Sequence, residues 1–170
     1  WINDAPSSSN YSSITAVKVT AGAKYVYNTK ADANDWLVSP AIHLEADKEY
    51  KVSFYVKTSG SFKESLRLAV ANANTADAMA TKSETLLDFP ELTEKTFVKK
   101  SVVYVARESG DYYFGLYEYS KKDLYNVFVT AFSVAENITT PAPVTGLTAT
   151  EGANEAITVD LKWTLPTKDE

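Results

Sequence analysis

The chain has 170 residues and a net charge of −5, and it contains no cysteine. This length is enough for one sizeable hydrophobic core, and the acidic balance argues against nucleic acid or an anionic membrane surface as the main partner. The absence of cysteine excludes disulfides, a thiolate zinc site and a cysteine nucleophile.

Strand patterns dominate the chain from residue 13 to residue 134. Alternating apolar and polar residues, bounded by turn residues, predict strands over residues 13–20, 24–28, 35–44, 50–58, 65–72, 97–106, 111–120 and 126–134. Residues 24–28 follow a turn at Gly22 and are predicted to pair back as a hairpin, and 75–87 is the one predicted helix or loop insertion. Short strands with little helix indicate an all-β sandwich or jelly roll.

The strand at 35–44 is interrupted by Ser39-Pro40. Proline cannot donate to a strand ladder, so we expect the chain to bend there from one sheet toward the other. Trp36, at the head of this strand, is predicted to be buried, because a large ring adds several kcal/mol of burial energy. The predicted core consists of Trp36, Leu37, Phe54, Val56, Leu68 and Phe114.

The composition changes after residue 138. Prolines and small residues predict a linker at 139–146, and residues 147–170 contain two further strand patterns, the second of which includes Val159, Leu161 and Trp163. We therefore divide the chain into a domain at 1–138, the linker, and a short module at 147–170.

Four stretches in the order "NDWLVSPAIHL", "YKVSFYVKT", "GDYYFGLYEYS" and "NVFVTAFSV" resemble the choice-of-anchor J domains, which are related to the cleaved-adhesin domains of Bacteroidetes surface proteins. The resemblance implies a jelly-roll β-sandwich of galactose-binding type. Residues 142–165 resemble the opening of a fibronectin type III module, so the tail is expected to be the first strands of a truncated module.

Catalytic residues are not expected. His43 is the only histidine, so no Ser-His-Asp unit can be built without it, and no metalloprotease or phosphate-loop motif occurs. A strand histidine is more often packed or solvent-facing than catalytic. The acidic residues, among them Asp88, Glu94, Asp111 and Glu118, lie mostly in turns or beside lysines, which is typical of a solvated face rather than a glycosidase pair.

No cofactor is predicted, with calcium as the alternative. Asp32, Asn34 and Asp35 lie close together in the sequence and are oxygen ligands of the kind that hard cations bind. They also suit a turn leading into the strand. Related domains often carry an Asp-Asp pair on the final strand, where this chain has Thr130 and Ala131. Calcium at Asp32 and Asp35 is therefore the weaker expectation.

Tyr117, Tyr119 and Tyr125 are the candidate ligand-binding residues. Alternation places Tyr117 and Tyr119 on one strand face, and Tyr125 lies in the following turn. Tyrosine offers a flat apolar face and a hydroxyl, which suits stacking on sugar rings. Core packing is the alternative for Tyr117 and Tyr119.

The resemblance, and the absence of a recognisable set of catalytic residues, favour a non-catalytic recognition module of a secreted or cell-surface bacterial protein. Its expected partner is an extracellular glycan or a host or matrix protein. A structural spacer and an accessory domain of a secreted hydrolase are the alternatives. No segment reaches the roughly 20 apolar residues that span a bilayer, and we expect a piece of a longer protein because the chain opens on Trp1. Any dimer is expected to form through the tail.

Overall fold

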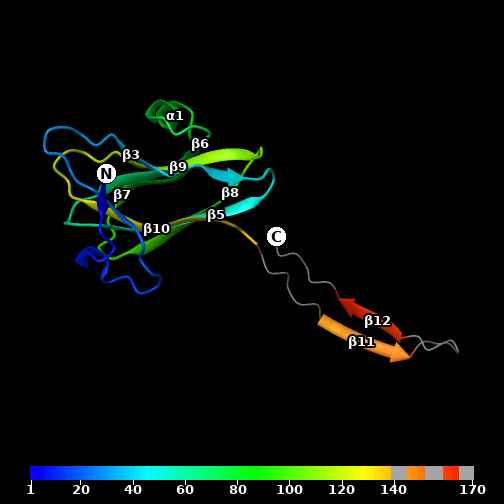
Figure 1. Cartoon of the computed structure of the whole chain (residues 1–170). Helices are drawn as coiled ribbons and strands as arrows, with labels where there is room; N and C mark the ends of the chain where they lie inside the picture. The colour runs from blue at the N-terminus through cyan, green and yellow to red at the C-terminus, as the bar shows by residue number, and fades with distance from the viewer. Residues whose placement is uncertain (139–144, 152–158, 165–170) are drawn as a thin grey trace. The chain divides into compact units, whose positions relative to one another are not determined.

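The computed structural model describes residues 1–138, 145–151 and 159–164. The chain divides into two compact units, Trp1–Asn137 and Ile138–Glu170 (Figure 1). Each unit is described by itself below.

The first unit is a sandwich of two antiparallel sheets, which confirms the predicted all-β jelly-roll class. One sheet has the order β1–β2–β10–β5–β8, with bounds Ile2–Asp4, Gly22–Tyr25, Val127–Glu136, Glu49–Thr58 and Val98–Val105. The other has the order β3–β9–β6–β7, with β4 also paired to β9, and bounds Asp35–Val38, Gly110–Glu118, Glu64–Ala71, Glu84–Leu92 and Ile42–Leu44. A 3-10 helix at Ser9–Tyr11 and the helix α1 at Ala76–Thr81 complete the unit.

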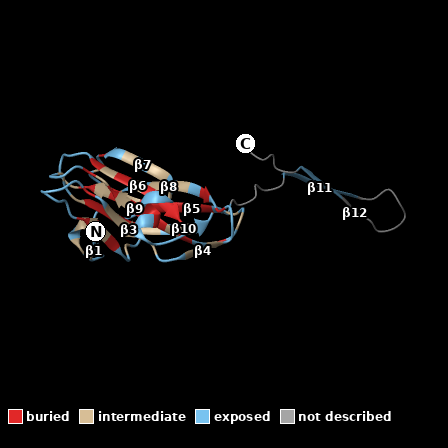
Figure 2. Ribbon diagram, turned by 90° about the horizontal axis from the view of Figure 1, so that it is seen from above, coloured by how far each residue is buried: buried red, intermediate tan, exposed pale blue. Residues whose placement is uncertain are grey.

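The hydrophobic core lies between the two sheets, where the alternating inward residues of their strands meet. Figure 2 shows that the buried residues are concentrated on the strands of this unit. Of the predicted core, Phe54, Val56, Leu68 and Phe114 are at most 1% exposed, and Leu37 packs against them half-buried. The period-2 pattern of β5, β6 and β9 therefore identified the inward face correctly.

The prediction that Trp36 belongs to this core is wrong. Trp36 lies directly opposite Tyr117 and Leu37 opposite Leu116, so Leu37 points inward and Trp36 points to the outer face of the sheet. There Trp36 packs with Val38 against a small separate cluster that contains Met79 of α1. The motif "DWLV" is apolar at three successive positions, so its pattern did not distinguish the two faces.

The break at Ser39-Pro40 is present, but it does not carry the chain to the other sheet, because β3 and β4 both pair with β9. Ser39 instead preserves the hydrogen bonding of β9 across the gap. Its backbone N–H donates to the Phe114 carbonyl at 2.9 Å, and its side-chain Oγ accepts from the Phe114 N–H at 3.0 Å. The proline follows where no ladder donor is needed.

Three further predictions differ from the structure. Residues 13–20 form no strand, and Ile14, Val17 and Val19 are half-buried without a ladder. The expected hairpin between 13–20 and 24–28 is therefore wrong, since β2 pairs with β1 and β10. The segment predicted as helix or loop at 75–87 holds the short α1 and then the start of β7, an edge strand whose Pro90 and register shifts obscure its alternation.

In the second unit, β11 (Thr145–Glu151) and β12 (Val159–Thr164) pair as an antiparallel two-stranded sheet. Leu147, Leu161 and Trp163 are 63%, 58% and 51% exposed. Most of the predicted linker, 139–144, lies outside the described residues, as do residues 152–158 and 165–170 of the predicted module.

Candidate functional site

A row of large side chains crosses the outer face of the sheet β3–β9–β6–β7. The strand registers place Trp36 opposite Tyr117, Tyr117 opposite Arg67, and Arg67 opposite Asp88. Four residues from four different strands therefore form one lateral line. With strands about 4.8 Å apart, this line is about 14 Å long.

The two rings of this line, those of Trp36 and Tyr117, stack on one another, and the ring of Tyr119 extends the stack beside the line. The Trp36 and Tyr117 ring centroids are 4.5 Å apart with an interplanar angle of 21°, and Tyr117 stacks in turn on Tyr119 at 5.5 Å and 15°. The guanidinium carbon of Arg67 lies 5.2 Å from the Tyr119 centroid, within the range of a cation–π contact. We call Trp36, Tyr117, Tyr119 and Arg67 the stacked row.

Hydrogen bonds fix the polar ends of the stacked row. The Tyr119 hydroxyl donates to Asp88 Oδ1 at 2.5 Å, and Arg67 donates to Asp88 Oδ2 at 3.3 Å. The Tyr117 hydroxyl donates to Asn34 Oδ1 at 3.0 Å. Burial, followed by the hydrogen bond to Asp88, raises the pKa of Tyr119 to about 12, so its hydroxyl stays protonated at neutral pH. The stacked row, together with its partners Asn34 and Asp88, thus presents ring edges, two hydroxyls, an amide, a guanidinium and a carboxylate at fixed positions.

Small residues lie beside the stacked row and are covered by α1 (Figure 1). Ala69 and Gly115 are opposite each other in register, and Met79 of α1 packs there with no exposed surface. A Cβ on Gly115 would overlap the Met79 methyl group and lie 2.8 Å from the Trp36 ring. Glycine is therefore required for Met79 and Trp36 to approach the sheet, and α1 closes the sheet face on this side.

The structure brings together Tyr117 and Tyr119 but not Tyr125. Tyr125 lies in the β9–β10 loop between two other rings, 5.5 Å from Tyr27 and 5.3 Å from Phe62 by centroid. Gly60, with φ +78°, lies directly under its ring. The three rings are 39–44% exposed, and we call them the loop cluster.

The weaker calcium candidates, Asp32 and Asp35, face cationic groups. Asp32 accepts from Lys121 Nζ at 2.8 Å and from the Lys122 N–H at 3.0 Å, and Asp35 accepts from the Trp1 α-amino group. Thr130 Oγ1, at one of the expected Asp-Asp positions, donates to the Ala21 carbonyl at 2.6 Å. Both side-chain oxygens of Asp32, one of Asp35 and the hydroxyl of Thr130 are thus already engaged in contacts within the protein.

His43 faces solvent on β4. Its Nδ1 lies 3.1 Å from Asp111 Oδ1, and both side chains are more than 60% exposed. An exposed pair of this kind is accessible to water and forms no enclosed site, which agrees with the solvent-facing interpretation.

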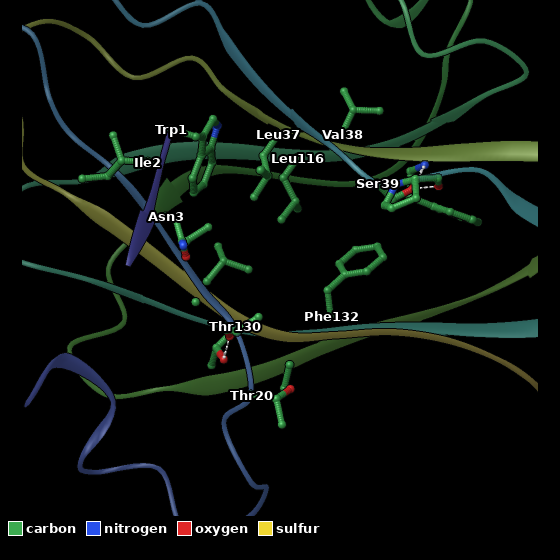
Figure 3. Close-up of a pocket in the computed structure, with 17 residues that line it drawn as sticks. Trp1, Ile2, Asn3, Thr20, Leu37, Val38, Ser39, Leu116, Thr130 and Phe132 are labelled. Carbon is green, nitrogen blue, oxygen red and sulfur yellow. Dashed lines mark hydrogen bonds between the residues drawn. The ribbon is translucent and has the colours of Figure 1, made fainter. Parts of the chain in front are cut away.

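A cavity of about 530 Å³ opens between the two sheets near β1 and β3 (Figure 3). Trp1, Leu37, Leu116 and Phe132 form much of its apolar wall. The hydroxyl of Thr130 at this cavity is engaged in the internal hydrogen bond described above. An apolar wall of this kind suits a hydrocarbon group better than a sugar, which needs several polar partners.

Sequence reasoning missed Trp36, Arg67 and Asp88 as ligand-binding residues, and it considered Asn34 only as a calcium ligand. Asp88 was interpreted as a solvated charge, and the contact of Arg67 and Asp88 with Tyr119 depends on strand order, which alternation does not specify. The one α-helix in the described part of the chain, α1, has six residues, so no membrane-spanning helix is found there.

No family profile matches the chain, and no curated protein matches it significantly. Solved structures do resemble it. The K3 cleaved adhesin domain of Lys-gingipain from Porphyromonas gingivalis has a TM-score of 0.51 at 15% identity, covering 68% of this chain and 73% of that one. The K1 domain of the same protein has a TM-score of 0.50 at 18% identity, covering 62% and 65%.

The N-terminal cellulose-binding domain of Cellulomonas fimi β-1,4-glucanase C has a TM-score of 0.50 at 10% identity, covering 72% of this chain and 81% of that domain. At sequence identities of 10%, 15% and 18%, these similarities show the fold alone. The first unit of the chain therefore has the jelly-roll β-sandwich fold that is found in adhesin and carbohydrate-binding domains.

Proposed function

We propose that the first unit is a non-catalytic recognition module that binds glycan through the stacked row, as part of a secreted or cell-surface protein. The observation that supports it is the line of Trp36, Tyr117, Arg67 and Asp88 across four strands. Glycan sites combine apolar ring surface with a few well-placed polar groups, and this line contains both. Similar solved domains include a cellulose-binding one, which agrees with the proposal.

The stacking geometry also suggests how a sugar would be held. Tyr117 has a ring on each side of it, so its faces are already covered. Trp36 lies on the edge strand β3, and one of its ring faces is turned away from Tyr117. One sugar unit would stack on that Trp36 face, and further units of the same oligosaccharide would lie along the row and hydrogen-bond with the tyrosine hydroxyls, Arg67 and Asp88.

The test is binding to a panel of soluble β-1,4-glucan, xylan, mannan and galactan by affinity electrophoresis, followed by calorimetry with the best ligand. Trp36→Ala and Tyr119→Ala should each weaken binding at least tenfold. Tyr55→Ala, which removes a half-buried ring from the outer face of the opposite sheet, is the matched control and should bind normally. Equal binding by all three variants, or a loss only in Tyr55→Ala, would contradict the proposal.

A further inference from the structure

The cavity between the two sheets lies beside a β-bulge in β10. The pairing of β10 with β5 skips Ala131 and Phe132, and these two residues together face the single residue Phe54. Two residues opposite one form a β-bulge, which bends its strand and interrupts the ladder. Both bulge residues line the cavity.

The other sheet has a matching irregularity at the Ser39-Pro40 break. Pairing with β9 stops at Val38 and resumes at Ile42, so residues 39–41 face only residues 113–114. The two residues of the break also line the cavity. The cavity therefore lies where both sheets depart from regular pairing, and these departures leave space that closely packed side chains would otherwise fill.

The bulge in β10 also contains a strained residue. Ala131 has φ +50°, in the left-handed region, which is costly for a residue that has a Cβ atom. Such strain persists only where the surrounding structure imposes it, and strained residues cluster at active sites and ligand sites. The strain at Ala131 thus lies in the wall of an apolar cavity, where it points to a binding role.

The wall of the cavity offers a ligand aromatic surface and few polar partners. Among the described residues that line it, none is Asp, Glu, Lys, Arg or His, and three are the aromatic residues Trp1, Phe114 and Phe132. The hydroxyls of Ser39 and Thr130 already donate to backbone carbonyls at 2.8 and 2.6 Å. A charged or strongly polar group would lose its hydration here without gaining a partner.

The cavity has a buried floor and an exposed mouth (Figure 3). Phe114, Leu116 and Val129 form the floor and are at most 3% exposed. Ile2, which is 52% exposed, and Thr20 lie at the mouth. A small molecule can therefore enter from solvent and reach the inward side chains of both sheets.

We propose that this cavity binds an uncharged aromatic small molecule. A dry apolar cavity of about 150 Å³ already takes benzene, so a volume of about 530 Å³ has room for a larger compound with two or three rings. Contact with Trp1, Phe114 and Phe132 favours an aromatic ligand, because aromatic rings pack well edge to face or offset against one another. This site is separate from the stacked row, and its ligand is independent of glycan binding.

The test uses the 170-residue chain and two matched fluorescent probes, N-phenylnaphthylamine and its sulfonated analogue anilinonaphthalene sulfonate. Both fluoresce more strongly in apolar surroundings, and only the second carries a charge. We expect N-phenylnaphthylamine to bind saturably at one site per chain, and the sulfonate to bind at least tenfold more weakly, because no cationic side chain lines the cavity. No saturable binding, or equal affinity for the two probes, would overturn the proposal.

Two variants fill the cavity from different sheets. Ala23 lies opposite the inward-facing Val129 and is half-buried, and Leu116 lies on the floor. Ala23→Leu and Leu116→Phe should each weaken binding of N-phenylnaphthylamine at least tenfold. Ala135→Leu adds the same side chain to an exposed position opposite Lys51, and this control should bind like the unmodified chain.

Thermal unfolding of each variant shows whether the added side chain fits. Ala23→Leu should keep or raise the midpoint, because filling an empty apolar space stabilises a fold, so the test stands even if Leu116→Phe disturbs the buried floor. A lower midpoint for Ala23→Leu would show that the space is not available to a ligand and would overturn the proposal. Unchanged probe binding by Ala23→Leu, or an equal loss in Ala135→Leu, would do the same.

Discussion

The Trp36 indole lies directly opposite Tyr117 on the outer face of the sandwich, with their ring centroids 4.5 Å apart. This pair joins the edge strand β3 to the central strand β9 by side-chain contact in addition to backbone hydrogen bonds. Cross-strand aromatic pairs stabilise a sheet modestly. Because Trp36 and Tyr117 lie away from the core, part of each ring is available to a ligand.

Trp36→Ala should therefore cost less stability than a core substitution. We expect a loss of about 1–2 kcal/mol, because the ring is only partly buried. Phe114→Ala, at a position that is 1% exposed, should cost about 3–5 kcal/mol. Urea unfolding of both variants measures the difference. A Trp36→Ala loss as large as that of Phe114→Ala would show that Trp36 acts as a core residue.

Gly115→Ala should disturb the stacked row from beneath. The added methyl group would overlap Met79 and lie 2.8 Å from the Trp36 ring, so we expect a loss of about 1–3 kcal/mol and weaker glycan binding. Met79→Ala empties a buried site and is itself destabilising, but in that background the added loss from Gly115→Ala should be smaller than in the unmodified chain, because the overlapping methyl group is gone. If Gly115→Ala cost the same in both backgrounds, the packing of α1 against this face would not be the cause.

Acid should weaken the fold partly through Glu94. Burial raises the pKa of Glu94, but hydrogen bonds from Lys100 and from backbone N–H groups outweigh it, so the pKa lies below its usual value. The unfolded chain then binds more protons at low pH, and the free energy of unfolding falls as the pH drops below the normal glutamate range.

Glu94→Gln should accordingly lose about 1 kcal/mol at pH 7 and approach the unmodified chain in stability near pH 3. Urea unfolding at pH 7, 5 and 3 measures this. Glu91→Gln, from the exposed pair with Lys63, is the control and should change little at any pH. A Glu94→Gln loss that is independent of pH would contradict the assignment.

We expect any dimer of this chain to form through the tail. An isolated two-stranded sheet is marginal in water, and Leu161 and Trp163 are more than half exposed. Sedimentation of residues 1–138 should show a monomer under conditions where the full chain associates. A 1–138 fragment that dimerises with equal affinity would assign the interface to the sandwich.

Strand alternation predicted the inward faces of β5, β6 and β9, because each of these strands has at least eight residues with one apolar side. It failed for β3, where four residues include three apolar ones. It also failed for Glu118, which was predicted to lie on a solvated face but has no exposed surface, since a charged residue at a strand end is normally assigned to the surface. The contact between Tyr119 and Asp88 joins residues 31 positions apart and follows only from strand order.

The central claim is that the outer face of β3–β9–β6–β7 binds glycan. Two-dimensional NMR of the 170-residue chain, titrated with the oligosaccharide that the polysaccharide panel selects, tests it most directly. The account predicts saturable shifts at the Trp36 indole N–H, at the rings of Tyr117 and Tyr119, and at the Arg67 guanidinium. Shifts confined to the outer face of β5 and β8, or to the loop cluster, would contradict it.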